Sequence, residues 1–292
     1  MMEKTTYQTE NPGRRKVILC IAGSDNTGGA GIQADLLTCN RFGCHAGTVV
    51  TAVTAQNYRG LRLIQPVGAD MLIAQLDTFF EAFTPDAVKI GLVPDDVSAD
   101  IIADVLCRHN VPNIVVDPVM GATCGGRFGN AISAAVLSGD TMDATELSGR
   151  FRLYDMATLL TPNLPEARIL AGNPDTDRVS EIARAIYRNF NPEYLLIKGG
   201  HTVEGKPDRT VCTDHLFDRE DAICEINMPR IDSPHTHGTG CALSSAIACG
   251  LAAGEAIDEA TYNGCLFLNE AISLGKKHPV TDHYGPLCYS DL

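Results

Sequence analysis

The sequence has no run of about 18 consecutive apolar residues, the length that a membrane-spanning helix needs. It also has no surplus of positive charge, because 36 acidic residues outnumber 23 basic ones and give a formal net charge of -13. An acidic chain repels nucleic acid and anionic lipid. We therefore expect neither nucleic acid nor a membrane as a partner, and any phosphate group must be bound locally, by a loop or a helix end.

The 11 cysteines form no CxxC pair and no cysteine–histidine cluster with the spacing of zinc ligands. A chain of 292 residues, 45% of them hydrophobic, can bury a large core and needs no disulfide bonds to fold. The cysteines are therefore predicted to be reduced thiols, as in a cytoplasmic protein.

No Pro/Ser-rich linker, internal repeat or change of composition divides the chain. Residues 1–15 contain no apolar signal-peptide core, so a flexible N-terminal extension is predicted there. We expect a single domain over residues 16–280, followed by a C-terminal tail over residues 281–292.

Short apolar runs alternate along the chain with helical patterns. Runs that are apolar on both faces are typical of buried parallel strands, and the alternation indicates an α/β fold with a parallel sheet. The predicted strands are residues 16–23, 47–55, 86–91, 113–119, 157–163 and 194–200. The predicted helices are residues 31–43, 69–83, 98–110, 166–172, 178–190, 241–253 and 258–275, with a β-hairpin over residues 208–232.

Polar or glycine-containing segments occur at the ends of five predicted strands. They are residues 23–25, 56–57, 117–118, 163–166 and 198–200. In parallel α/β sheets, ligands bind at the carboxyl ends of the strands. The sequence therefore predicts one site at this edge of the sheet.

The first glycine-rich turn, AGSDNTGGAGIQAD, covers residues 22–35 and leads from a strand into a helix. It matches neither GxGxxG nor the P-loop pattern GxxxxGK[ST], so its spacing permits either a ligand-binding loop or a tight turn. Its glycines allow positive φ angles and the close approach of a ligand. Asp25 beside them can hold a substrate hydroxyl or ring nitrogen, or cap the helix.

The second turn, HTHGTGC at residues 235–241, precedes a helix of small apolar residues. Gly238 and Gly240 allow successive backbone N–H groups to point into one space, and the helix N-terminus adds about half a positive charge. Together they predict an anion hole for a phosphoryl group. The alternative is a plain helix start with Thr239 as its N-cap residue.

Cys241 follows directly, in the first turn of that helix. A helix N-terminus lowers the pKa of a thiol from its usual value of about 8.5, and a thiolate there can accept the proton of a hydroxyl group that attacks phosphorus. The usual role of cysteine is that of a small buried apolar side chain. The spacing by itself leaves both interpretations open.

Three further segments carry charge or capping groups. Asp117 in IVVDPVM is placed to hold Mg²⁺ or its water ligands. Asn163 and Glu166 in TPNLPEA lie on one face of a helix start, where they suit metal-bound water or form a capping box. Lys198 in LLIKGGH suits a phosphate group or an ion pair.

The order of these motifs resembles the hydroxymethylpyrimidine kinase/phosphomethylpyrimidine kinase family of thiamine biosynthesis, in the ribokinase-like superfamily. The resemblance rests on AGSDNTGGAGIQADL, TAVTAQNYRG, DAVKIG, VVDPVM, LLTPNLPEA, LLIKGGH and THGTGCALSSAIA. It implies a three-layer α/β/α sandwich with a mostly parallel central sheet. It also implies transfer of the ATP γ-phosphoryl group to 4-amino-5-hydroxymethyl-2-methylpyrimidine and then to its monophosphate, with Mg²⁺ and a homodimer.

The resemblance also implies roles for individual residues. It places Gly23, Asp25 and Gln56 at the aminopyrimidine alcohol, Gly238, Thr239 and Gly240 in the anion hole, and Cys241 at the position of the catalytic base. It places Asp117 and Glu166 at the metal, and Asn163, Lys198, Thr236, Gly238 and Gly240 at ATP. Sugar kinases of the superfamily carry aspartate where Cys241 stands, whereas pyrimidine kinases and some pyridoxal kinases carry cysteine.

Two segments depart from the family pattern. Leu92 replaces the methionine that usually follows KIG, and the glycine-rich residues 121–128 are closer to the corresponding loop of pyridoxal kinases. A pyridoxal/pyridoxine kinase is therefore the alternative function, although Gln56 and Lys198 favour the pyrimidine. A non-catalytic vitamin-binding protein is disfavoured because the residues of the anion hole and the base are intact. The family pattern gives residues 139–153 no role.

Overall fold

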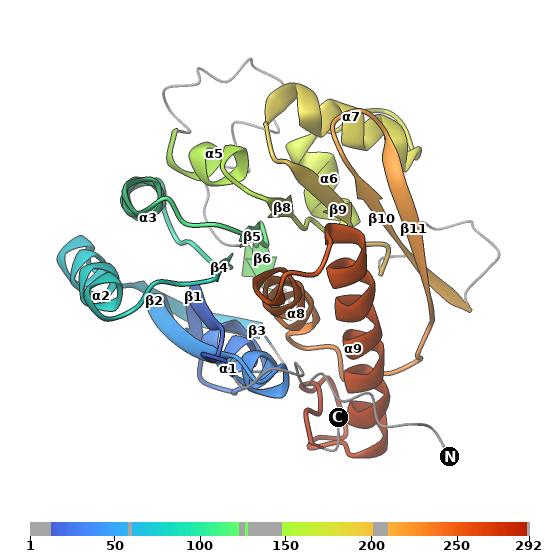
Figure 1. The fold of residues 1–292 in the computed structure, drawn as a ribbon. Coiled ribbons are helices and arrows are strands. Elements are labelled where there is room, and N and C mark those ends of the chain that lie inside the picture. The colour runs from blue at the N-terminus through green and yellow to red at the C-terminus, as the bar shows by residue number, and fades with distance from the viewer. Residues whose placement is uncertain (1–12, 58–59, 123–125, 128–147, 201–209, 291–292) are drawn as a thin grey trace.

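Nine strands form one central sheet in the computed structural model, which describes residues 13–57, 60–122, 126–127, 148–200 and 210–290 (Figure 1). The strands are β1 (Val17–Asp25), β2 (His45–Asn57), β3 (Gly60–Pro66), β4 (Ala87–Ile90), β5 (Ile114–Val116), β8 (Leu159–Leu160), β9 (Tyr194–Ile197), β10 (Val211–Phe217) and β11 (Ala222–Pro229). Their order is β11-β10-β9-β8-β5-β4-β1-β2-β3. The strands from β9 to β2 are parallel, and β3, β10 and β11 add antiparallel pairs at the two edges.

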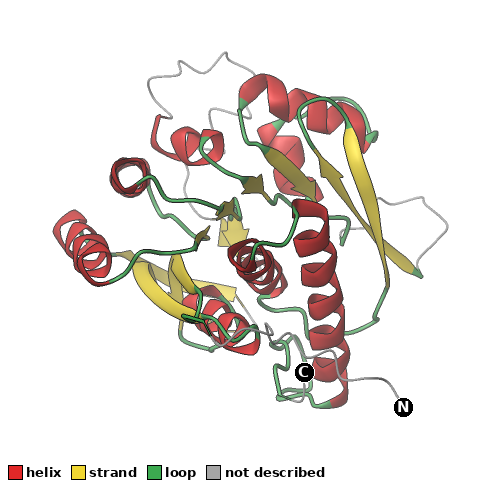
Figure 2. Cartoon of the chain, viewed as in Figure 1, coloured by secondary structure: helices red, strands yellow, loops and turns green. Residues whose placement is uncertain are grey.

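Helices cover both faces of the sheet, as Figure 2 shows. One face packs against α2 (Ala69–Ala82), α3 (Asp96–His109), α5 (Ser148–Asp155), α6 (Leu164–Leu170) and α7 (Val179–Asn189). The other face packs against α1 (Gly31–Arg41), α8 (Thr239–Ala253) and α9 (Ile257–Lys277). The predicted three-layer α/β/α sandwich with a mostly parallel sheet is confirmed.

A hydrophobic core lies on each face of the sheet, and the side chains of β1 alternate between the two cores. Leu19 and Ile21 pack with α2 and α3, whereas Ile18 and Cys20 pack with α1 and α8. Successive residues of a strand point to opposite faces of the sheet, so a strand between two helical layers must be apolar on both faces. This is why the parallel strands could be predicted from uninterrupted apolar runs.

Four elements were missed by the sequence prediction: β3, α5 and the short strands β6 (Gly121–Ala122) and β7 (Gly126–Arg127). Strand β3 pairs with β2 at the edge of the sheet, where half-exposed residues weaken the apolar signal. Helix α5 is short and polar, and its Arg152 pairs with Asp100 on α3 at 3.0 Å. Its stability comes from tertiary contacts that a local pattern does not contain.

Residues 121–128, which set the chain apart from its family, are described in part. Strand β6 (Gly121–Ala122) pairs with β7 (Gly126–Arg127) in a separate two-stranded sheet, while residues 123–125 and 128 lie outside the described residues. Most of the stretch 139–153 also lies outside them, apart from its part in α5.

The C-terminal residues after α9 pack back onto the domain. The backbone N–H of His237 donates to the carbonyl of Gly285 at 3.0 Å, and Leu287 is buried beside Ala242 and Ala246 of α8. The division into an extension, one domain and a tail stays a prediction, since residues 1–12 and 291–292 lie outside the described residues. No described helix is both long and apolar enough to cross a membrane.

Candidate active site

A cavity of about 930 Å³ lies beyond the carboxyl ends of the parallel strands. Every residue that the sequence predicted to act on substrate, ATP or metal lines it: Gly23, Asp25, Gln56, Asp117, Asn163, Glu166, Lys198, Thr236, Gly238, Thr239, Gly240 and Cys241. The topology explains this convergence, because β2 follows β1 on one side whereas β4 and the later parallel strands continue on the other. Such a switch point leaves a crevice outside the carboxyl ends of the strands.

The first glycine turn is organised around the Asp25 carboxylate. That carboxylate accepts hydrogen bonds from the backbone N–H of Thr27 and of Ala30, both at 2.9 Å, and from the Thr27 hydroxyl. Its Oδ2 also lies 2.7 Å from Nε2 of His237. Burial by itself raises the pKa of Asp25, but the hydrogen bonds from His237 and Thr27 outweigh it and lower the pKa to about 2. Asp25 therefore holds the turn in place, and its contact with a substrate stays a prediction.

Replacing Asp25 with asparagine is expected to lower the free energy of unfolding by about 2 kcal/mol at pH 7. The pKa of the folded state lies below the ordinary value of 3.8. The stabilisation is therefore complete above about pH 4 and is lost as the pH falls towards 2. Urea unfolding of both proteins at pH 7 and near pH 2.5 measures this, and the difference should shrink in acid. An equal difference at both pH values would contradict the assignment.

The second glycine turn starts α8 with Gly238 at the N-cap, in a left-handed conformation with φ of 88°. Thr239 is the first helical residue, so the interpretation of Thr239 as the N-cap is wrong; the left-handed backbone at this position favours glycine. Gly240 and Cys241 lie in the first turn, where N–H groups lack intrahelical acceptors. This turn presents the positive end of α8 to the cavity.

The two glycine turns touch each other. A Cβ on Gly238 would stand 1.9 Å from the carbonyl oxygen of Gly29, and a Cβ on Gly29 would stand 2.6 Å from the ring of His237. The pair of Asp25 and His237 links the same two turns. Residues some 200 positions apart therefore form one rigid rim beside the anion hole.

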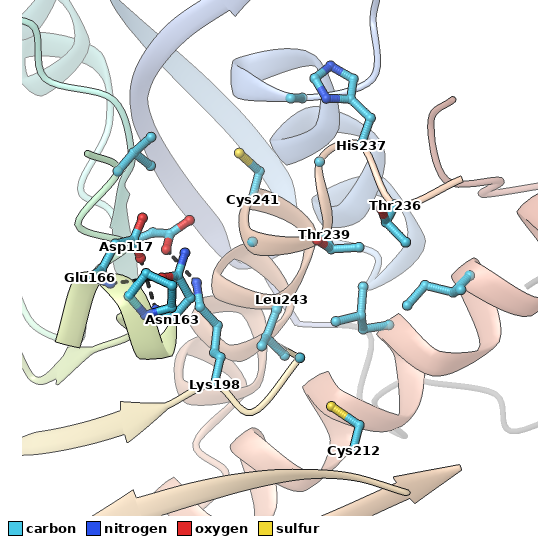
Figure 3. Close-up of a pocket in the computed structure, with 18 of the residues that line it drawn as sticks. Asp117, Asn163, Glu166, Lys198, Cys212, Thr236, His237, Thr239, Cys241 and Leu243 are labelled. Atoms are coloured by element: carbon cyan, nitrogen blue, oxygen red, sulfur yellow. Dashed lines mark hydrogen bonds and ion pairs between the residues drawn. The ribbon is translucent and has the colours of Figure 1, made fainter. Parts of the chain in front are cut away.

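Charged groups gather on the opposite side of the α8 N-terminus, as Figure 3 shows. Nζ of Lys198 donates to Oδ1 of Asp117 at 2.8 Å. Asn163 and Glu166 form a complete capping box at the start of α6, with two reciprocal bonds of 2.9 Å. The capping interpretation of this pair is confirmed, and its role towards metal or ATP stays a prediction.

The carboxylates of Asp117 and Glu166 fit a magnesium ion. Burial raises the pKa of Glu166 to about 7; the Lys198 ammonium opposes this rise and the Asp117 carboxylate adds to it. A cation between the two carboxylates would relieve their repulsion. The described residues include no group of three or more histidine, cysteine or acidic side chains arranged for a metal. Mg²⁺ keeps water and substrate phosphates as most of its ligands, so two carboxylates are enough to hold it.

Cys241 is half-exposed at the tip of the α8 turn, facing the cavity. Burial raises the pKa of its thiol to about 11, although Lys89 lowers it. The expectation that the helix N-terminus would lower this pKa is therefore wrong. Removal from water disfavours the thiolate more than the helix end and Lys89 favour it.

The far end of the cavity contains Gly23 and Gln56. A Cβ on Gly23 would stand 2.7 Å from Cδ2 of Leu92, so a larger residue there would require that leucine side chain to shift. Nε2 of Gln56 donates to the hydroxyl of Thr54 at 3.1 Å, which leaves the amide oxygen of Gln56 as an acceptor for a ligand.

Sequence reasoning missed three polar groups around the site. His237 supports Asp25, and buried Asp214 accepts the backbone N–H of Gly199 at 2.7 Å and so orients the turn after Lys198. Lys89, fully buried, pairs with Asp35 at 2.8 Å. A lysine inside the apolar run DAVKIG was the available signal, because a buried ammonium requires a carboxylate partner.

Comparison with known proteins gives concordant matches. The family model described as phosphomethylpyrimidine kinase matches residues 25–288. A hydroxymethylpyrimidine/phosphomethylpyrimidine kinase of Rhizobium meliloti is 38% identical over 274 residues, covering 93% of this chain and 96% of the relative.

Two solved structures have the same fold. The ADP complex of Bacillus subtilis pyridoxal kinase superposes with a TM-score of 0.77 at 31% identity, covering 95% of this chain and 98% of that one. A phosphomethylpyrimidine kinase from Clostridium difficile 630 superposes with a TM-score of 0.68, also at 31% identity, covering 88% of this chain and 100% of that one.

Proposed function

The chain belongs to the phosphomethylpyrimidine kinase family, and on this premise we propose that it transfers the γ-phosphoryl group of ATP to 4-amino-5-hydroxymethyl-2-methylpyrimidine and then phosphorylates the monophosphate. The observation that carries the proposal is the convergence of all twelve predicted site residues on one cavity. Phosphoryl transfer needs positioning and charge stabilisation, and this cavity supplies both.

The cavity has a place for each reactant. Gly23 and Gln56 mark the end that takes the aminopyrimidine, whose exocyclic amine suits the free amide oxygen of Gln56. Apolar side chains of Met228, Leu243 and Leu268 line the part between β11, α8 and α9 and suit the adenine ring. The N-terminal turn of α8 lies between the two and receives the phosphoryl group in transfer.

The reaction conserves atoms and charge as follows. The hydroxymethyl oxygen forms a bond to the γ-phosphorus while the bond from that phosphorus to the bridging oxygen breaks, and ADP leaves with the electron pair. The hydroxyl proton passes to Sγ of Cys241, which must be a thiolate at that moment. The Gly238–Gly240 turn holds the transferred group, and Lys198 shifts from Asp117 towards the phosphates.

Asp117 and Glu166 would hold Mg²⁺, which would neutralise phosphate charge. Replacing Glu166 with glutamine keeps the capping box, because glutamine also accepts at this position. We expect an unchanged melting temperature and about a tenfold higher Mg²⁺ concentration for half-maximal activity. In the wild type that concentration should rise below about pH 7, where Glu166 binds a proton, and the variant should lack this rise. Equal Mg²⁺ titrations of the two proteins would remove Glu166 from the metal site.

Pyridoxal phosphorylation is the second candidate, favoured by the superposition on Bacillus subtilis pyridoxal kinase. Purified enzyme with ATP and each alcohol decides between them by kcat/KM. We expect the pyrimidine to be preferred, and Gln56→Leu, which removes the free acceptor, should raise the KM for the pyrimidine more than that for pyridoxal. A much higher kcat/KM on pyridoxal would reverse the assignment of substrate.

The active form is proposed to be a cytoplasmic homodimer. Each of the ten cysteines in the described part of the chain is a free thiol, which suits a reducing compartment. Val53 on β2 and Leu63 on β3 are 54% and 64% exposed at the sheet edge, and a second copy would cover them. Sedimentation equilibrium at micromolar concentration measures the assembly, and a mass of 31.2 kDa would show a monomer instead.

A further inference from the structure

A buried ion pair lies behind the α8 turn and plays no part in the reaction as described so far. Nζ of Lys89 on β4 donates to Oδ1 of Asp35 on α1 at 2.8 Å, and both side chains are fully buried. Moving two charges out of water is unfavourable, and such a pair is weak evidence for stability. Holding α1 against the sheet does not by itself account for this ion pair, so a second role is sought for it.

The ion pair lies beneath Cys241, one turn further along α8, where Ser245 contacts it. The hydroxyl of Ser245 donates to the same Oδ1 of Asp35 at 2.9 Å. Ser245 follows Cys241 by four residues on α8, so the two share a face of that helix, which packs on β4 and α1. A Cβ on Gly91 would stand 2.8 Å from Nζ of Lys89, so Gly91 leaves the space that the ammonium occupies.

The ammonium keeps donors available for the sulfur. It carries three N–H groups, and within the described part of the chain Asp35 is its one hydrogen-bond acceptor. Burial by itself lowers the pKa of Lys89. The Asp35 carboxylate raises it more strongly, with smaller contributions from Cys241 and Asp117, so the pKa is raised overall and the ammonium stays charged. Lys89 opposes the rise in the thiol pKa of Cys241 more strongly than Asp35 adds to it.

We propose that Lys89 is a positioning residue for the transfer step: its ammonium stays beneath Cys241 and stabilises the thiolate that accepts the hydroxyl proton. This deepens the proposed function and rests on it. The charged and titratable groups that act on the sulfur are Lys89 on β4, Asp35 on α1, Asp117 after β5, Lys198 after β9 and Tyr289 near the C-terminus. Both lysines are paired with a carboxylate, but Lys198 moves towards the phosphates in the proposed reaction, whereas Lys89 is fully buried and keeps its place behind the turn.

The test is the rate at which iodoacetamide alkylates Cys241, followed by mass spectrometry of its peptide between about pH 7 and 9.5. Below the thiol pKa this rate is proportional to the thiolate fraction, so one pKa unit is about tenfold in rate. Lys89→Met should alkylate about tenfold more slowly than the wild type at pH 8. The double variant Lys89→Met/Asp35→Asn also removes the smaller, opposite effect of Asp35 on the thiol pKa, so its rate should fall by only about threefold. It leaves no buried charge unpaired, so it serves if the single variant does not fold.

Ser245→Ala is the matched control, because it removes a hydrogen bond to Asp35 and changes no charge. We expect it to alkylate at close to the wild-type rate. A wild-type rate in the double variant, or an equal loss in Ser245→Ala, would overturn the proposal. Alkylation needs no turnover, so it stays informative even if the enzyme phosphorylates neither alcohol, which would be a failure of the proposed function alone.

Turnover supplies a second readout. In the double variant kcat should fall about threefold at neutral pH, its rise with pH should move to slightly higher pH, and the KM for ATP should change little. A lower kcat with an unmoved pH profile would show that the pair only holds the fold together.

Discussion

Replacing Cys241 with alanine is expected to reduce kcat by about two to four orders of magnitude, with little change in the affinity for ATP. The half-exposed sulfur faces the cavity at the tip of the turn that receives the phosphoryl group. Without it, the reaction loses the base that the proposed function assigns to the hydroxyl proton. Single-turnover kinetics with saturating ATP measures the effect, and a near wild-type kcat would remove Cys241 from the role of base.

The pH dependence separates this role from simple packing. The thiol pKa of about 11 means that the thiolate fraction rises about tenfold per pH unit across the neutral range. kcat of the wild type should therefore increase with pH, and kcat of Cys241→Ala should be flat. Cys107→Ala, which removes an exposed thiol from α3, is the control and should behave as the wild type. Cys241→Asp should recover part of the loss, because a carboxylate also accepts a proton.

Replacing Gly238 with alanine is expected to lower kcat by about 100-fold or more and to destabilise the fold. The residue has φ of 88°, which an L side chain rarely adopts, and its Cβ would stand 1.9 Å from the carbonyl oxygen of Gly29. Neither backbone segment can yield without moving the anion hole or the first glycine turn. Kinetics and thermal melting measure the two effects together.

Gly254 at the other end of α8 is a matched control for this variant. It has φ of 95°, and among the described residues no atom lies within 4 Å of the point where its Cβ would stand. Gly254→Ala should therefore destabilise the protein by about 1 kcal/mol through backbone strain alone and leave kcat unchanged. If both variants lost the same stability and neither lost kcat, the contact between the two glycine turns would have no catalytic importance.

Helices and strands with a strong local pattern were predictable, and so was the edge of the sheet that carries the site. The run 16–23 became β1 because alternate residues enter two different cores, and the box from Asn163 to Glu166 was readable because its bonds join residues three apart. The same logic failed for α5 and β3. Their pairing with α3 and β2 lies outside any local window.

Asp25 and Cys241 illustrate what residue spacing leaves open. An aspartate at position 25 suits contact with a ligand. In the structure its carboxylate is instead hydrogen-bonded to backbone groups of its own turn and lies within hydrogen-bond distance of His237, which is far along the chain. The position of Cys241 at a helix N-terminus predicts a lowered thiol pKa, but burial of the side chain raises that pKa. The histidine partner of Asp25 and the burial of Cys241 both arise only when distant segments of the chain pack together.

The sequence by itself determined the α/β architecture, the order of the motifs and the residues that would meet at the carboxyl edge of the sheet, because these follow from local periodicity, turn chemistry and the direction of parallel strands. Only the tertiary structure decided which charges face one another. Along the chain, Lys89 is 54 residues from its partner Asp35, and Ser245 is 210 residues from the same aspartate. Electrostatic energies depend on distance and burial rather than on position in the chain, so the environment of the Cys241 sulfur belongs to the folded molecule.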